Sequence, residues 1–142
     1  ADEIALVREL TTRIWTRLER ARAEVALRES EARFRNMADH APVMVWMTES
    51  DASCSFLSQS WYDFTGQTLE MGLGFGWLTA THPEDCSESE RIFKQANERQ
   101  EAFSLEYRLR AKDGTYRWCI DSAQPRFSSS GEFLGYIGSV LD

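Results

Sequence analysis

The sequence has little cysteine. Its three cysteines, Cys54, Cys86 and Cys119, are odd in number, widely spaced and form no Cys-x-x-Cys pair. A disulfide framework needs an even set of cysteines and a zinc knuckle needs closely spaced ones, so neither is expected. A reducing cytoplasm is therefore the expected location.

Long apolar runs are also absent. No stretch approaches the ~18–20 apolar residues that cross a bilayer, and no charged, apolar and small-residue segment of a secretory signal is present. We therefore expect no direct membrane insertion of this chain. Because the chain starts at Ala1 rather than at Met, we expect it to be a piece of a longer protein.

Positively charged residues are fewer than negatively charged ones. The 16 Lys and Arg residues stand against 23 Asp and Glu residues, which gives a formal net charge of -7. Binding to a nucleic-acid backbone requires Lys and Arg clustered on one face, so nucleic acid is excluded as an expected partner. An anionic membrane surface is disfavoured for the same reason.

Residues arranged for catalysis are missing as well. No Ser-His-Asp arrangement is suggested, and no Gly-Lys-Ser or Gly-Lys-Thr loop that could cradle a phosphate is present. The two histidines, His40 and His82, are too far apart in the sequence to suggest a metal site. We nominate no catalytic residue and no metal ligand.

Apolar and aromatic residues are plentiful. They make up 42% and 12% of the 142 residues, with five Trp and eight Phe, which is enough for one globular core with a short appendage. The first thirty or so residues contain neither Gly nor Pro and predict one continuous helix, so we divide the chain into a helix over residues 1–29 and a domain over residues 30–142.

The predicted helix has a heptad pattern. Its apolar seam is expected to contain Ile4, Val7, Ile14, Leu18, Ala21 and Val25, with Thr11 in the same series and a break at Arg28. Arg and Glu residues occupy the flanks. A stripe this narrow favours a coiled coil between two chains, whereas a helix that packs on its own domain usually shows a wider apolar face.

The remainder of the chain predicts strands at both ends and helices between them. Two short strands near 43–47 and 54–57 form a hairpin, and a longer helix runs from His82 and Pro83 toward Arg99. Three strands then follow, separated by Lys112-Asp113-Gly114 and Ser128-Ser129-Ser130-Gly131. In the second of these three, Tyr116, Trp118 and Ile120 are expected on the buried face. The order predicts an α+β fold with an antiparallel sheet.

The last strand is apolar on both faces, so one face must meet a covering helix or a partner chain. We expect Leu134 and Tyr136 on the outer side, near the dimer interface. Together with the helix seam, these two residues complete the predicted interface.

Several segments resemble the PAS family, in the subgroup common in bacterial sensor kinases. They are residues 29–35, 40–46, 61–66, 82–85, 107–118 and 138–142, in the family's order. The resemblance implies a five-stranded antiparallel sheet with short helices on one face. Residues 9–28 resemble the linker helix that joins a GAF or phytochrome-type domain to a PAS domain. One departure is Ala52, where the family commonly has Gly in the first hairpin turn.

Members of this family hold flavin, haem, a metabolite or nothing between the sheet and the short helices. The residues expected to line that space are Trp46, Phe56, Trp61, Phe64, Phe75, Trp77, Phe93, Tyr107 and Trp118. The cofactor remains open. A flavin adduct is disfavoured because no cysteine lies in the required motif, and haem is disfavoured because residues 84–99 contain no histidine. The alternative is that these aromatic residues only fill the core, since bulky side chains leave little of the ~300 Å³ that a typical ligand needs.

The resemblance implies a non-catalytic sensory and dimerisation module of a bacterial two-component signalling protein. We expect a homodimer formed through the helix, neighbouring GAF, PAS and kinase domains in the same protein, and a possible small-molecule ligand. The expected output domain is a histidine kinase. Two alternatives remain, namely a ligand-free dimerisation spacer and the PAS module of a diguanylate cyclase.

Overall fold

A computed structural model describes residues 2–142, which form two units divided between Met37 and Ala38. The elements in chain order are α1 (Asp2–His40), β1 (Met44–Thr48), β2 (Cys54–Leu57), α2 (Gln59–Thr65), α3 (Leu69–Gly72), the 3-10 helix η1 (Gly76–Ala80), α4 (Pro83–Arg99), β3 (Phe103–Arg110), β4 (Tyr116–Phe127) and β5 (Phe133–Leu141). The first helix thus continues without a break past the predicted boundary at residues 29 and 30.

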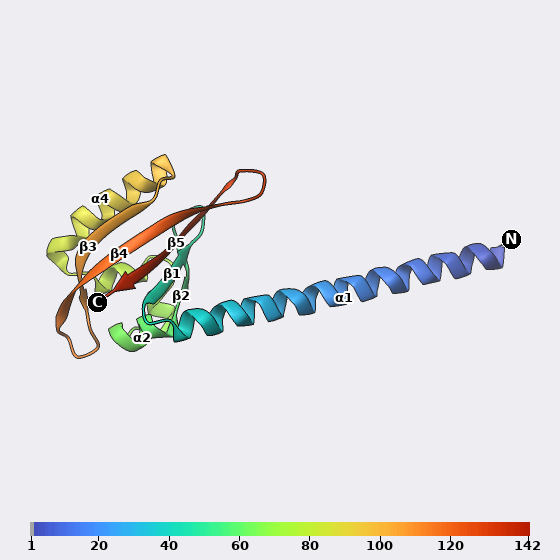
Figure 1. Ribbon diagram of the computed structural model, residues 1–142, viewed down its shortest axis with the longest axis horizontal. Helices are drawn as coiled ribbons and strands as arrows, with labels where there is room; N and C mark the ends of the chain where they lie inside the picture. Colours follow the sequence, from blue (N-terminus) through green and yellow to red (C-terminus); the bar gives the residue numbers. More distant parts are fainter. Residues whose placement is uncertain (1) are drawn as a thin grey trace. The chain divides into compact units, whose positions relative to one another are not determined.

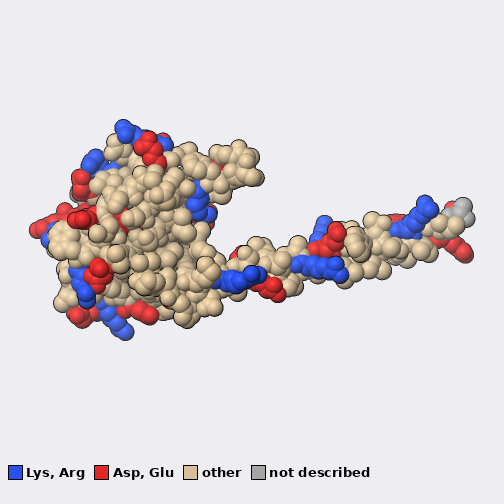
Figure 2. Space-filling model, viewed as in Figure 1, with Lys and Arg blue, Asp and Glu red and all other residues tan. Residues whose placement is uncertain are grey.

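Helix α1 has polar and apolar side chains along its whole length. Figure 2 shows that Lys and Arg side chains alternate with Asp and Glu side chains along it rather than gathering by sign. Arg13 pairs with Glu9 one turn earlier at 2.7 Å, which stabilises an exposed helix only slightly. Within residues 2–142, no helix has both the length and the apolar character that a membrane span requires.

The second unit is built on a five-stranded antiparallel sheet with the order β2-β1-β5-β4-β3 (Figure 1). The helices lie on one face of it, because Trp61 of α2, Ala80 of η1 and Ala96 of α4 share one core with inward residues of the strands. Helix α4 runs alongside β3 in Figure 1. The predicted α+β fold and the five-stranded sheet are confirmed.

The start of α4 is fixed by a side-chain cap and by an ion pair. The side chain of His82 accepts the Glu84 backbone N–H at 3.1 Å, while Asp85 accepts the backbone N–H of Arg108 and its guanidinium, at 2.8–2.9 Å. These bonds lower the pKa of Asp85 to about 2, chiefly through the side chain of Arg108. They join the first turn of α4 to β3.

The expected orientation of strand β4 is wrong. Tyr116, Trp118 and Ile120 face away from the core, and Trp118 is 61% exposed. The residues that point inward are Cys119, Asp121 and Ala123. Alternation shows that a strand has two faces, but it does not tell which face is buried. In β4 the outward residues are more apolar than the inward ones, so the prediction from hydrophobicity chose the wrong face.

The expected placement of Tyr136 on the outer side of β5 is also wrong. Tyr136 has no exposed surface, and its hydroxyl lies within hydrogen-bond distance of the backbone oxygens of Ala96 and Glu101, which share its one proton. The cause is a bulge, because Arg126 is opposite Gly135 and Phe127 is opposite Phe133. This leaves one residue, Leu134, without a partner and shifts the alternation of the strand by one position. Leu134 itself is 39% exposed.

The turn between β1 and β2 contains Ala52 with a φ of 73°. This left-handed conformation destabilises a residue with a Cβ atom by roughly 1–2 kcal/mol. Glycine avoids that strain, but its greater loss of chain entropy on folding costs roughly 0.5–1 kcal/mol. We expect Ala52→Gly to raise the free energy of unfolding by about 0.5–1 kcal/mol in urea denaturation. The control is Ala123→Gly in the extended strand β4, which should lower it. A loss of stability in Ala52→Gly would show that the turn is not strained.

Candidate functional site

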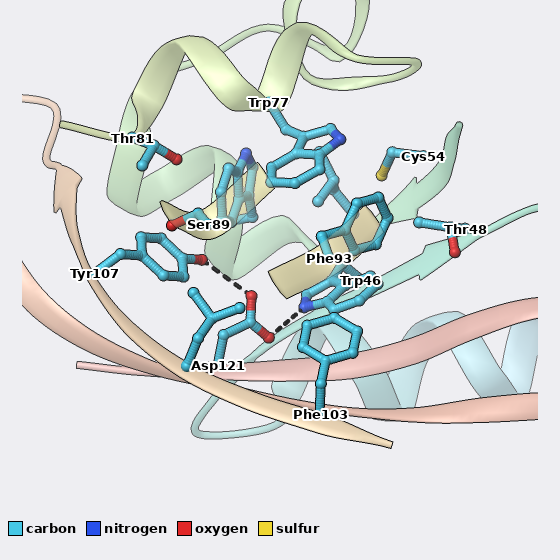
Figure 3. A pocket seen from close by; sticks show the side chains of 13 residues that line it. Trp46, Thr48, Cys54, Trp77, Thr81, Ser89, Phe93, Phe103, Tyr107 and Asp121 are labelled. Atoms are coloured by element: carbon cyan, nitrogen blue, oxygen red, sulfur yellow. Dashed lines mark hydrogen bonds between the residues drawn. The ribbon is translucent and has the colours of Figure 1, made fainter. Parts of the chain in front are cut away.

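A small cavity lies between the sheet and the helices of the second unit (Figure 3). The space inside it that is open to water-sized groups is about 30 Å³. Its lining consists of Trp46, Thr48, Cys54, Leu57, Trp61, Trp77, Thr81, Ser89, Phe93, Phe103, Leu105, Tyr107 and Asp121. Six of these thirteen residues are aromatic, and one is acidic.

The acidic group is Asp121 of β4, which is 6% exposed. One of its carboxylate oxygens accepts the indole N–H of Trp46 at 2.8 Å, and the other accepts the hydroxyl of Tyr107 at 3.1 Å. Figure 3 shows the carboxylate pointing into the cavity between these two side chains. Burial raises the pKa of Asp121 to about 7, against the lowering effect of both hydrogen bonds.

A glycine on β5 allows Trp46 to reach Asp121. Trp46 is on β1 and Asp121 is on β4, and β5 runs between these strands. Trp46 is opposite Gly138 in the β1–β5 pair, and a Cβ atom at that position would overlap the indole ring. The absence of a side chain at Gly138 therefore opens the path of the indole across β5.

The aromatic wall is centred on Phe93 of α4. Its ring meets those of Trp46, Trp77 and Phe103 edge to face, with centroids 5.8–6.5 Å apart. Such edge contacts stabilise ring packing beyond the burial of area alone. They hold α4 against strands β1 and β3 and fix the walls of the cavity.

The connector between α2 and η1 is anchored by a buried amide. The side chain of Gln67 accepts the indole N–H of Trp61 at 2.9 Å and donates to Thr79 at 3.1 Å and to the backbone oxygen of Gly76 at 3.3 Å. Because buried polar groups are costly unless they are paired, these bonds favour one conformation of the connector. Trp61 is thereby held at the cavity.

Five of the predicted lining residues reach the cavity, namely Trp46, Trp61, Trp77, Phe93 and Tyr107. The other four do not line it. Trp118 lies on the outer face of the sheet, where Arg108 stacks over its ring at 5.1 Å. Phe75 is 56% exposed, while Phe56 and Phe64 are half-buried outside the cavity.

Sequence reasoning missed Asp121 and Gln67. Asp121 alternates with Cys119 and Ala123 on the inward face of β4. An acid between two small buried residues would have been noticed had the strand been oriented correctly. Gln67 follows the helix-ending Gly66 and carries no pattern that sets it apart from a loop residue.

The sequence matches the PAS fold family over residues 55–140, which is more than half of the chain. The chain belongs to the PAS family. PAS domains are in general non-catalytic sensory modules, and they commonly dimerise and relay signals to other domains. The present domain is a PAS sensory domain, in agreement with the resemblance seen in the sequence.

Two relatives extend this result. The chain is 50% identical over 117 residues to an uncharacterised protein, y4lL, of Sinorhizobium fredii, covering 82% of this chain and 14% of that protein. It is 29% identical over 131 residues to the peroxide stress-activated histidine kinase mak1 of Schizosaccharomyces pombe, covering 82% of this chain and 8% of that protein. The chain thus spans only a small part of these relatives.

The solved structures agree on the fold. A PAS domain from Colwellia psychrerythraea superposes with a TM-score of 0.65 at 18% sequence identity, covering 78% of this chain and 94% of that one. At this level of identity the likeness concerns the fold alone. It supports the assignment of the PAS fold to the sheet and its helices.

The raised pKa of Asp121 leads to a test of stability against pH. A carboxyl group with a pKa of about 7 in the fold and ~3.9 in the unfolded chain stabilises the fold when protonated. Its contribution is complete below pH ~4 and is lost as the pH rises to 7, by a few kcal/mol at most. The free energy of unfolding of Asp121→Asn minus that of the original chain should therefore increase from pH 5 to pH 8.

Urea denaturation at both pH values measures this gain. The control is Asp113→Asn, because Asp113 is exposed and hydrogen bonds from Thr115 lower its pKa. Its stability difference from the original chain should stay constant over the same range. The same constancy in Asp121→Asn would mean that Asp121 titrates normally.

Proposed function

We propose that this chain senses a small ligand in the cavity of its PAS domain and passes the signal to the output domain of a larger protein. The observation that carries the proposal is the almost fully buried carboxylate of Asp121 inside an aromatic cavity. An acid is costly to a purely structural core, because burial penalises its charged form. An acid with a shifted pKa in a cavity is typical of a functional site.

The output domain that we propose is a histidine kinase. The name of the yeast relative supports this proposal, although the chain spans only 8% of that protein. ATP-dependent autophosphorylation of the full-length protein would support it, whereas formation of cyclic di-GMP from GTP would indicate a diguanylate cyclase. The three cysteines are free thiols, and we place the module in the cytoplasm, where thiols stay reduced.

A retained ligand is the direct test of sensing. Native mass spectrometry of the freshly purified chain detects a tightly bound ligand as a stoichiometric, non-covalent small molecule that is lost on denaturation, and titration with candidate ligands followed by thermal unfolding detects a weakly bound one. The absence of both signals from several independent preparations would favour the ligand-free dimerisation spacer. Phe93→Ala removes the central ring of the cavity wall and enlarges the cavity. The fraction of the chain that binds the small molecule should therefore change.

We further propose that α1 mediates dimerisation. The apolar side chains of its predicted seam, namely Ile4, Val7, Ile14, Leu18 and Val25, are each 49–62% exposed. Together with Thr11 and Ala21 they alternate in steps of three and four residues, which suits a two-stranded coiled coil. The part of the 39-residue helix from Ile4 to Val25 would offer a seam of about 32 Å at 1.5 Å per residue.

The outer face of the sheet is a second candidate surface. Trp118 and Ile120 of β4 and Leu141 of β5 are 46–61% exposed, and Ile120 is directly opposite Leu141 in the ladder. Leu134 lies exposed at the bulge on the same strand as Leu141. Apolar residues that neighbour one another on a sheet face are typical of contact surfaces, and we assign this face to contacts of the module with a helix or a partner chain.

The dimer proposal is tested by placing charges in the seam. Each buried Leu or Ile is worth ~1.5–3 kcal/mol of apolar transfer, so we expect Ile14→Glu with Leu18→Glu to convert the dimer to a monomer in analytical ultracentrifugation. The matched control is Thr12→Glu with Thr16→Glu, which adds the same charge away from the seam and should leave a dimer. A folded Ile14→Glu and Leu18→Glu chain that stays dimeric would show that the interface lies elsewhere.

A further inference from the structure

The cavity has a negative group and no positive one. None of its lining residues is Lys, Arg or His, and Asp121 is its one carboxylate. Of the other titratable groups nearby, Tyr107 donates a hydrogen bond to Asp121, Cys119 lies next to it on the inward face of β4, and Cys54 lines the same cavity. Burial raises the pKa of Tyr107 and raises those of the two thiols to about 11. These three groups therefore stay neutral near pH 7, and the charge of Asp121 has no counterpart.

Asp121 also has unused acceptor capacity. An ionised carboxylate offers about four lone-pair sites, and each of its oxygens accepts one hydrogen bond here, from Trp46 or from Tyr107. The hydroxyls of Thr81 and Ser89 line the same cavity and make no hydrogen bond within residues 2–142. Figure 3 places both on the Tyr107 side of the cavity. A ligand with several N–H donors could donate hydrogen bonds to the carboxylate and to these hydroxyls.

The aromatic walls favour a cation of a particular kind. Ring faces attract ammonium groups, and the walls include Trp46, Trp61 and Trp77. Metal ions such as Mg²⁺ and Ca²⁺ need six or more oxygen ligands, which these walls do not supply. Within the part of the chain that the structure describes, no three His, Cys, Asp or Glu residues are grouped so as to hold a metal.

The volume of the cavity limits the size of the ligand. A single water centre needs ~10–15 Å³, so the cavity of about 30 Å³ accepts two or three non-hydrogen atoms. We propose that it binds ammonium or a primary alkylammonium ion of one or two carbons, with the nitrogen on Asp121 and the alkyl group against the rings. This inference rests on the proposed sensory function and names the chemical class of its ligand.

Titration of the whole chain with ethylammonium chloride tests the inference, with KCl as the reference at constant ionic strength. Three of the five Trp residues line the cavity, so binding should change the intrinsic fluorescence in a saturable way. For three non-hydrogen atoms the limits of ligand efficiency place Kd at about 1 mM at the tightest. At 100 mM the unfolding temperature should rise by several degrees in ethylammonium and not in KCl.

Removal of the Asp121 charge by mutation and its protonation at lower pH should each weaken binding. Asp121→Asn removes the charge and retains the shape, so Kd should rise at least tenfold. The matched variant Glu106→Gln removes an exposed carboxylate from β3 and should leave Kd unchanged. Should Asp121→Asn fail to fold, the original chain still provides a test. Ethylammonium remains charged from pH 6 to pH 8 while Asp121 ionises, so binding should tighten about tenfold over that range.

The outcomes separate the two proposals. An equal response to KCl, or no saturable response to ammonium and ethylammonium, overturns the ammonium assignment. If native mass spectrometry then still finds a retained neutral or anionic molecule, ligand sensing stands and only its chemical class changes. If no molecule of any kind is retained, both proposals fail. Saturation that is lost in Asp121→Asn and kept in Glu106→Gln supports the inference.

Discussion

The burial of Asp121 is the constraint on which the interior of this PAS domain depends. A carboxylate that is 6% exposed must find hydrogen-bond donors inside the protein, because water is excluded. The donors are Trp46 of β1 and Tyr107 of β3, which lie on opposite sides of β4 in the sheet order. One acid thus connects both halves of the sheet on the face that the helices cover.

The other parts of the domain adjust to this arrangement. Cys119 and Ala123, the inward neighbours of Asp121, are small, which leaves room above β4 for the rings of Trp46 and Phe93. The bulge at Leu134 turns Tyr136 inward, where its hydroxyl fixes the end of α4 through Ala96. The apolar residues excluded from the interior gather on the outer face of the sheet, which is why the domain has an apolar surface there.

Local signals in the sequence predicted much of the fold. Pro83 marked the start of α4, and Gly114 and Gly131 marked the two hairpin turns, where both have a positive φ. These features depend on short-range backbone rules, and a single sequence contains them. The orientation of β4 and the bulge in β5 depend on which residues lie opposite one another in the folded sheet. A single sequence does not contain that information when both faces of a strand are apolar.

The site was predictable in part for the same reason. The resemblance to the PAS family pointed to Trp46, Trp61 and Phe93 as lining residues, whereas Asp121 depended on the orientation of β4. Trp118 was misplaced through the same error. A polar residue in a strand with two apolar faces therefore deserves to be considered on both faces before a lining is assigned.

The contact between Trp46 and Gly138 restricts how this domain can change during evolution. A side chain at position 138 would overlap the indole, so the two positions cannot vary independently. A lineage that replaces Trp46 with a smaller residue frees position 138, and one that gains a side chain at 138 must first lose the indole. In an alignment of close relatives these two positions should covary, and Asp121 should be replaced wherever its donor on β1 is absent.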